Sequence, residues 1–215
     1  WAAKQRNLFW KDDLSLWSDV VKKSPFKARP HNNLAVAYNE KDLMEQAIAE
    51  AVIALRLRQN YASPFISLGN AYFKKGAFDM AIMSFKKALS IKSDYPDAYF
   101  SMGLTYAKKN DMDPAIEAFK KAIELRPYDV TARVNLAAAY GSKGLTDTAI
   151  AELRQAMTIK PDSPDIHYNL GVAFEGKGLL FNALSEYKTV LLLSPDDREA
   201  LDKYHEIRKK LKMSL

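Results

Sequence analysis

The residues best able to do chemistry in this 215-residue sequence are three histidines and a larger set of carboxylates, and the sequence has no cysteine. The absence of cysteine excludes disulfides, thiolate metal sites and thiol nucleophiles. His31 and His167 each stand three residues before a leucine, and Phe65 and Tyr99 occupy the same position elsewhere in the chain. Because aromatic rings replace these histidines, we expect both to be packing residues.

No arrangement of these residues matches a known catalytic pattern. The sequence has no His-Glu zinc motif, no glycine-rich phosphate loop and no nucleophile elbow. The glycines of "GKG" at 176–178 indicate the end of a helix, and most carboxylates stand at predicted helix ends or on polar faces, where solvation accounts for them. We therefore expect a chain that is not an enzyme and that uses neither a metal nor another cofactor.

The net charge of +6 is confined to the two ends of the chain. Residues 1–29 carry seven Lys and Arg against three Asp and Glu, and residues 198–215 carry six against three. The stretch between them carries 19 against 20 and is nearly neutral. A nucleic-acid-binding surface needs a continuous basic stripe. The charge pattern therefore argues against nucleic acid as a partner.

One sequence motif recurs every 34 residues and predicts a repeated pair of helices. A small residue recurs at that spacing, an aromatic ring follows three residues later, and an alanine follows nine residues after the ring. The small residues are Ala35, Gly69, Gly103, Ala137 and Gly171; the rings are Tyr38, Tyr72, Tyr106, Tyr140 and Phe174; the alanines are Ala47, Ala81, Ala115, Ala149 and Ala183. Spacings of three and four place such residues on one helix face, so each repeat holds two helices.

The residues between the two helices fit a break. A lysine recurs in all five copies, followed by Asp42, Gly76, Asn110, Gly144 or Gly178. Glycine and asparagine suit the left-handed end of a helix. In the third copy Asp113 and Pro114 predict an N-cap and the first helical residue of the second helix.

This pattern resembles the tetratricopeptide repeat, a 34-residue helix–turn–helix unit. The resemblance implies an all-α, right-handed superhelical solenoid of antiparallel helix pairs with a concave groove. It divides the chain into a lead-in and half-repeat helix (1–27), five repeats (28–61, 62–95, 96–129, 130–163 and 164–197) and a C-terminal capping helix (198–215). A terminal repeat needs such a cap because it would otherwise expose its neighbour-facing surface.

The family binds its ligands on the concave face of the first helices, opposite the packing residues. Large apolar side chains and a partial row of amides are expected there, suited to the side chains and the backbone of a peptide. The predicted peptide- or protein-binding residues are Asn33, Ile66, Asn70, Phe73, Phe100, Leu104, Asn135, Tyr168 and Asn169. An alternative is that Phe73, Phe100 and Tyr168 pack against neighbouring first helices. The stripe lacks the cations that clamp chaperone C-termini in other members of the family.

The N-terminal stretch suggests a larger protein. "WAAKQRNLFW" at 1–10 mixes aromatic and basic residues, which suits a membrane–water interface, although the rings could instead cover the first half-repeat. Residues 6–38 resemble the junction in transmembrane-and-tetratricopeptide membrane proteins, which include glycosyltransferase-like enzymes. That resemblance implies repeats on the periplasmic or luminal side, joined to the membrane only through an upstream segment.

Two functions remain open. The first is a non-catalytic protein-interaction scaffold that binds a peptide or partner protein as the C-terminal part of a larger membrane protein. The alternative is a free-standing adaptor for assembly or secretion, which would be expected in the cytoplasm.

Overall fold

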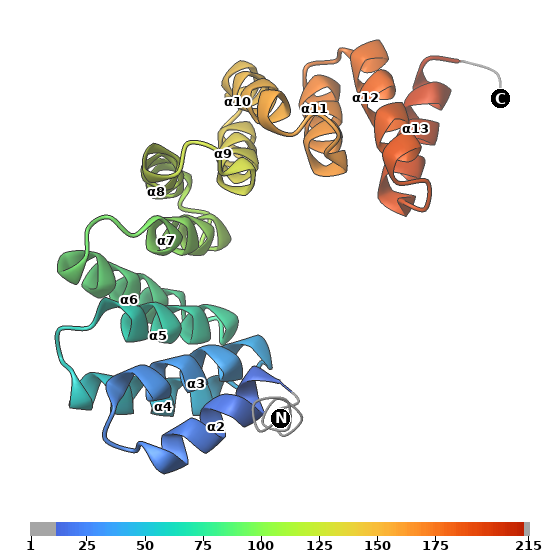
Figure 1. Ribbon diagram of the computed structural model, residues 1–215. Helices are drawn as coiled ribbons and strands as arrows, with labels where there is room; N and C mark the ends of the chain where they lie inside the picture. The colour runs from blue at the N-terminus through green and yellow to red at the C-terminus, as the bar shows by residue number, and fades with distance from the viewer. Residues whose placement is uncertain (1–11, 213–215) are drawn as a thin grey trace. The chain divides into compact units, whose positions relative to one another are not determined.

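The computed structural model describes residues 12–212, which form twelve α-helices without a strand (Figure 1). The all-α prediction is confirmed. Two compact units divide this range near residue 109. The first unit contains α2 (Asp13–Lys23), α3 (Ala28–Glu40), α4 (Met44–Leu57), α5 (Ala62–Lys74), α6 (Phe78–Ile91) and α7 (Pro96–Lys108). The second contains α8 (Met112–Leu125), α9 (Val130–Ser142), α10 (Thr146–Ile159), α11 (Pro164–Gly176), α12 (Leu180–Leu193) and α13 (Arg198–Lys210).

Within each unit, every helix packs against the next one along the chain. The first helices of successive repeats also touch each other: α3 contacts α5, α5 contacts α7, and α9 contacts α11. Four first helices, α3, α5, α9 and α11, therefore contact both their own second helix and a neighbouring first helix. The second set of contacts builds the continuous face on which the candidate site lies.

The break between the helices of each repeat has the expected left-handed geometry. The residue after the lysine has positive φ in all five copies, from 55° at Asp42 to 75° at Gly76. The second helices then start two residues later than this turn residue, at Met44, Phe78, Met112, Thr146 and Leu180. The prediction for Asp113 is wrong: Asp111 is the N-cap of α8, and Asp113 lies in its first turn. The repeat geometry fixes the start of this helix more strongly than the local Asp-Pro signal does.

Small residues at the repeat-defining positions allow the helices to approach closely. Ala47, Ala81 and Ala183 are completely buried. Gly69 lies against the ring of Phe85, and a Cβ atom at position 69 would overlap that ring. Large buried side chains, such as Phe85 in α6 and Tyr187 in α12, fill the space that the small residues leave. This alternation of small and large side chains is what the sequence repeat encodes.

The last helix, α13, covers the end of the second unit. Its Ala200 and Ile207 are fully buried against α12, while most of its charged residues remain exposed. Burial raises the pKa of Glu175 on α11, but hydrogen bonds and charges from Lys203 and Lys210 on α13 outweigh burial and hold that pKa below its usual range. A polar clasp thus accompanies the apolar contact between α13 and the repeats.

The recurrent lysine has a structural role that its position in the sequence does not reveal. In each unit it reaches back to an acidic residue at the start of the preceding repeat's second helix, 30 residues earlier. The pairs are Lys75–Glu45, Lys109–Asp79, Lys143–Asp113 and Lys177–Asp147. We call this set the lysine ladder. It ties neighbouring repeats together at one edge.

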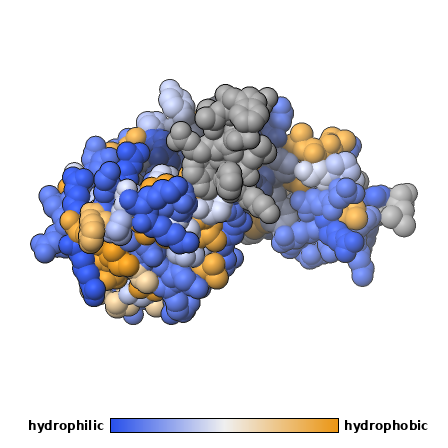
Figure 2. Space-filling model, turned by 60° about the horizontal axis from the view of Figure 1, so that its bottom comes forward, coloured by the Kyte–Doolittle hydropathy of each residue, from blue (hydrophilic) through white to orange (hydrophobic). Residues whose placement is uncertain are grey.

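Residues 1–11, which include the aromatic and basic stretch at 1–10, lie outside the described range. No helix within residues 12–212 combines the length and the apolar character needed to cross a membrane. On the surface seen in Figure 2, hydrophobic residues form small groups between hydrophilic ones.

Candidate functional site

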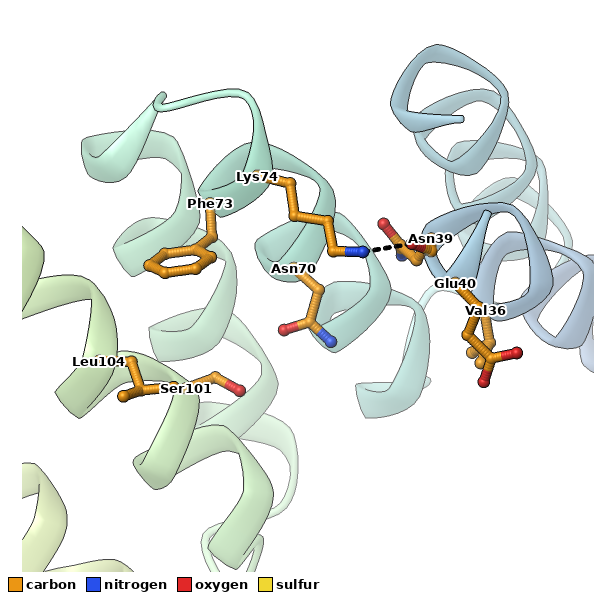
Figure 3. Close-up of a pocket in the computed structure, with 8 residues that line it drawn as sticks. All are labelled: Val36, Asn39, Glu40, Asn70, Phe73, Lys74, Ser101 and Leu104. Atoms are coloured by element: carbon orange, nitrogen blue, oxygen red, sulfur yellow. Dashed lines mark hydrogen bonds between the residues drawn. The ribbon is translucent and has the colours of Figure 1, made fainter. Parts of the chain in front are cut away.

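The first helices of the first unit, α3, α5 and α7, present a shared face that we call the first-helix face. A cavity of about 340 Å³ opens on it, lined by residues from all three helices (Figure 3). Three of the predicted binding residues, Asn70, Phe73 and Leu104, line this cavity. Each is half-buried, so each contributes to packing and still presents atoms to the groove.

The cavity has apolar walls and a polar centre. Val36 from α3, Phe73 from α5 and Leu104 from α7 supply the apolar surface, and Figure 3 shows Asn70 between Val36 on one side and Leu104 on the other. The ring of Phe73 is also held by the Phe78 ring of α6, with centroids 5.9 Å apart. An apolar cavity with a few placed polar groups is the usual form of a ligand pocket.

Asn39 and Lys74 fix the polar wall between α3 and α5. Lys74 Nζ donates to the backbone oxygen of Asn39 at 2.5 Å and pairs with Asp42 at 2.6 Å. The side-chain amide of Asn39 donates to the Ser67 backbone oxygen at 2.9 Å, while its Oδ1 atom is buried without a hydrogen-bond partner among the described residues. An unsatisfied buried acceptor costs about 1–3 kcal/mol. This wall therefore holds one polar atom that a ligand could satisfy.

The predicted amide row differs between the two units. The side chain of Asn70 makes no hydrogen bond within the described chain, so both its donors and its acceptor remain for a ligand. In the second unit, Asn135 donates to the Thr131 backbone oxygen, and Asn169 donates to that of Asp165. The amide oxygen and one N–H of each of those two residues remain for a peptide backbone. The amides of the predicted residues thus differ in the hydrogen-bonding groups that they leave free for a ligand.

The second unit has two cavities of its own between α9 and α11. The larger has a volume of about 450 Å³ and is lined by small residues such as Ala138, Gly141 and Gly176, together with Asn169. The smaller has a volume of about 280 Å³ and contains both Asn135 and Asn169. These two predicted residues therefore lie together, as their 34-residue spacing requires.

The remaining predicted residues lie outside these three cavities. Asn33 accepts a long hydrogen bond from Asn32 at 3.5 Å, and Ile66 and Phe100 are half-buried on α5 and α7. The hydroxyl of Tyr168 donates to Glu199 of α13 at 2.6 Å, and its ring lies 5.7 Å from the ring of Tyr187. Burial, and then the hydrogen bond to Glu199, raises the pKa of Tyr168. Tyr168 thus takes part in the contact between α11 and α13.

The two equivalent histidines, His31 buried and His167 half-buried, lie in polar surroundings. His31 Nδ1 lies 2.6 Å from Glu50 and its Nε2 lies 2.9 Å from the Pro25 oxygen. His167 repeats the arrangement with Glu186 at 2.7 Å and the Pro161 oxygen at 2.9 Å. Arg133 occupies the same repeat position and contacts Glu152 and the Pro127 oxygen. Within residues 12–212, no group of three or more acidic or histidine side chains could hold a metal.

Five lining residues are not among the predicted binding residues: Val36, Asn39 and Ser101, and the two charged residues, Glu40 and Lys74. The two charged residues stand at equivalent positions of successive first helices, four residues after Val36 and Asn70, which also line the cavity. The helical spacing of four was the available signal, but charged residues at the end of a helix are ordinarily explained by solvation. The structure instead places both at the rim of the cavity (Figure 3).

Comparison with known proteins agrees with this geometry. A model described as TPR repeat matches residues 69–110 and 142–178, and one described as tetratricopeptide repeat matches residues 96–129. Among curated protein sequences, none matches the chain.

Several solved structures have the same fold. YrrB, described as a TPR protein with an unusual peptide-binding site, is 25% identical, with a TM-score of 0.70 over 86% of this chain and 96% of YrrB. MamA is 26% identical, with a TM-score of 0.68 over 87% of this chain and 97% of MamA. TTC0263 from Thermus thermophilus is 20% identical, with a TM-score of 0.63 over 84% and 98% of the two chains. Together with the helix pairs described above, these matches show that the chain is an all-α array of tetratricopeptide repeats.

Proposed function

We propose that this chain is a non-catalytic scaffold that binds a peptide, or an extended segment of a partner protein, on its first-helix face. The observation that carries the proposal is the cavity between α3, α5 and α7, which brings together Asn70, Phe73 and Leu104. The apolar walls suit a ligand side chain, and the uncommitted amide of Asn70 suits a peptide backbone. The peptide-binding site named for YrrB supports the same kind of ligand.

Paired measurements of stability and partner capture test this proposal. Leu104→Ser removes apolar surface from the cavity wall, and Asn70→Ala removes the uncommitted amide. We expect both variants to lose most of the partner captured from cell extract while the denaturation midpoint changes little. Asp202→Asn, at an exposed position on α13, is the matched control. Unchanged capture by both cavity variants would contradict the proposal.

We further propose that the scaffold is the C-terminal part of a larger membrane protein, on the periplasmic or luminal side. The support is the resemblance of residues 6–38 to the junction that follows the last membrane helix in transmembrane-and-tetratricopeptide proteins. The glycosyltransferase-like chemistry of that family would then reside upstream of this chain. Reading the gene upstream tests the idea, because several hydrophobic segments there support it. A nearby start codon would instead favour a free-standing adaptor.

A further inference from the structure

One repeat position at the ends of α3, α5 and α7 carries charges of both signs. Glu40 on α3, Lys74 on α5 and Lys108 on α7 occupy the same repeat position at intervals of 34 residues. Lys74 is neutralised by Asp42, with 2.6 Å between Nζ and the carboxylate. Among the described residues, Glu40 and Lys108 have no such ion pair, and both are exposed. Glu40 therefore brings a free negative charge to the α3 side of the cavity lining, and Lys108, which stands one helical turn after the lining residue Leu104, brings a free positive charge to α7.

The centre of the cavity favours an apolar side chain flanked by peptide backbone. Phe73 and Leu104 form its apolar wall, while Asn70 offers an amide with no other commitment. The buried Oδ1 atom of Asn39, on the α3 side, lacks a donor among the described residues. A backbone N–H entering between α3 and α5 would supply that donor, because an amide oxygen pairs readily with a peptide N–H.

We propose that this cavity selects a peptide segment in which a bulky apolar residue has a basic residue on one side, bound by Glu40, and an acidic residue on the other, bound by Lys108. The inference rests on the proposed function and specifies its ligand. Complementary charges on α3 and α7 would fix the placement of the peptide and exclude segments of uniform charge.

Helix spacing sets the distance between the ligand's charges. Packed helices lie about 8–10 Å apart, so the α3 and α7 ends of the cavity lie about two such spacings apart. An extended peptide advances about 3.3 Å per residue. The basic and acidic residues should therefore stand about five or six positions apart, with the apolar residue about midway.

A selection from a displayed library of random peptides against the 215-residue chain tests the inference, followed by calorimetric titration of the selected peptides. We expect the selected sequences to share the basic–apolar–acidic pattern. Replacement of Glu40 by glutamine should weaken binding about two- to fivefold, as for an exposed ion pair, with less effect at high salt. Glu40→Lys and Lys108→Glu should each weaken binding more strongly, by about tenfold, because they place like charges together. Asp202→Asn is the matched control and should leave affinity unchanged.

The possible results separate the inference from the proposed function. Peptides that lose affinity with Leu104→Ser, but tolerate Glu40→Lys and Lys108→Glu within about twofold, would overturn the charge pattern and leave the peptide scaffold standing. Peptides that are insensitive to Leu104→Ser and Asn70→Ala would overturn both. A selection that yields no binding peptide would overturn the inference, while partner capture that depends on Leu104 and Asn70 would still support the scaffold.

Discussion

Gly171 lies directly against the ring of Tyr187, and a Cβ atom added at position 171 would lie only 2.6 Å from Cε1 of that ring. Gly69 and Phe85 have the same relationship in the second repeat. Where alanine replaces this glycine, as at Ala137, the facing residue is the smaller Leu153, and both are buried. In the second, fourth and fifth repeats the two positions therefore act as a pair of nearly constant combined volume, whereas the first repeat has alanine at both positions, Ala35 and Ala51.

This pairing predicts strong coupling between positions 69 and 85. Gly69→Ala should lower the free energy of unfolding by about 1–3 kcal/mol, because the added methyl group overlaps a fixed ring. In the double variant with Phe85→Leu, the pair resembles Ala137 and Leu153 and the loss should be smaller than the sum of the single losses. We expect a coupling energy of about 0.5–3 kcal/mol from chemical denaturation of the four proteins. Additive losses would show that the two side chains are energetically independent.

The sequence was sufficient to predict the helix pairs, the left-handed turns and the close packing, because each depends on a residue type that recurs every 34 positions. Asp42 and Gly76 illustrate this, since different residues at one repeat position share a positive φ. The start of α8 was mispredicted because a local Asp-Pro signal competed with the repeat geometry. The cavity rim was missed for another reason. Glu40 and Lys74 have opposite charges at one repeat position, so no residue type recurs there to mark a function.

The histidine position should contribute more to stability than its sequence pattern suggests. His167→Ala would leave the Pro161 oxygen and the half-buried Glu186 without their partner. We expect a loss of about 1–3 kcal/mol in the free energy of unfolding. His167→Arg is the matched control, because Arg133 makes the equivalent contacts with Glu152 and Pro127. The arginine variant should recover most of the loss, and equal losses in both variants would rule out a role for the paired contacts.

The recurrent lysine is conspicuous in the sequence, but the ion pairs of the lysine ladder should contribute little to the free energy of unfolding. The side chains of Lys143 and Asp113 are 35% and 78% exposed, so water and salt screen their attraction. Exposed pairs of this kind contribute about 0.2–1 kcal/mol. We expect Lys143→Gln to change the free energy of unfolding by no more than that, with the difference shrinking in about 1 M salt. A larger, salt-independent loss would mean that the ladder fixes the spacing of the repeats.

The contacts of Glu175 on α11 with Lys203 and Lys210 on α13 should make the free energy of unfolding depend on pH. Burial raises the pKa of Glu175, yet Lys203 and Lys210 more than offset it, so the folded-state pKa is depressed. A depressed carboxyl pKa stabilises the folded state above the unfolded pKa, about 4.3, and this contribution disappears as pH falls through the folded-state pKa. Glu175→Gln should therefore be less stable than the parent at about pH 7, and the two should converge below about pH 4. A difference in stability between the two proteins that persists at low pH would indicate that the variant loses packing contacts, not charge interactions.

Tyr168 decides between the two interpretations of the predicted stripe. Its hydroxyl donates to Glu199 of α13 and its ring packs beside Tyr187, so its contacts are those of a residue that joins the capping helix to the last repeat. Tyr168→Phe should lower the free energy of unfolding by about 0.5–1.5 kcal/mol through loss of one hydrogen bond, and Tyr168→Ser by several kcal/mol through loss of the ring. Peptide capture by Tyr168→Phe should remain at the parent level. Leu104→Ser should show the opposite behaviour, with capture lost and stability nearly kept. If Tyr168→Phe instead lost capture without losing stability, Tyr168 on α11 would belong to a ligand site as well.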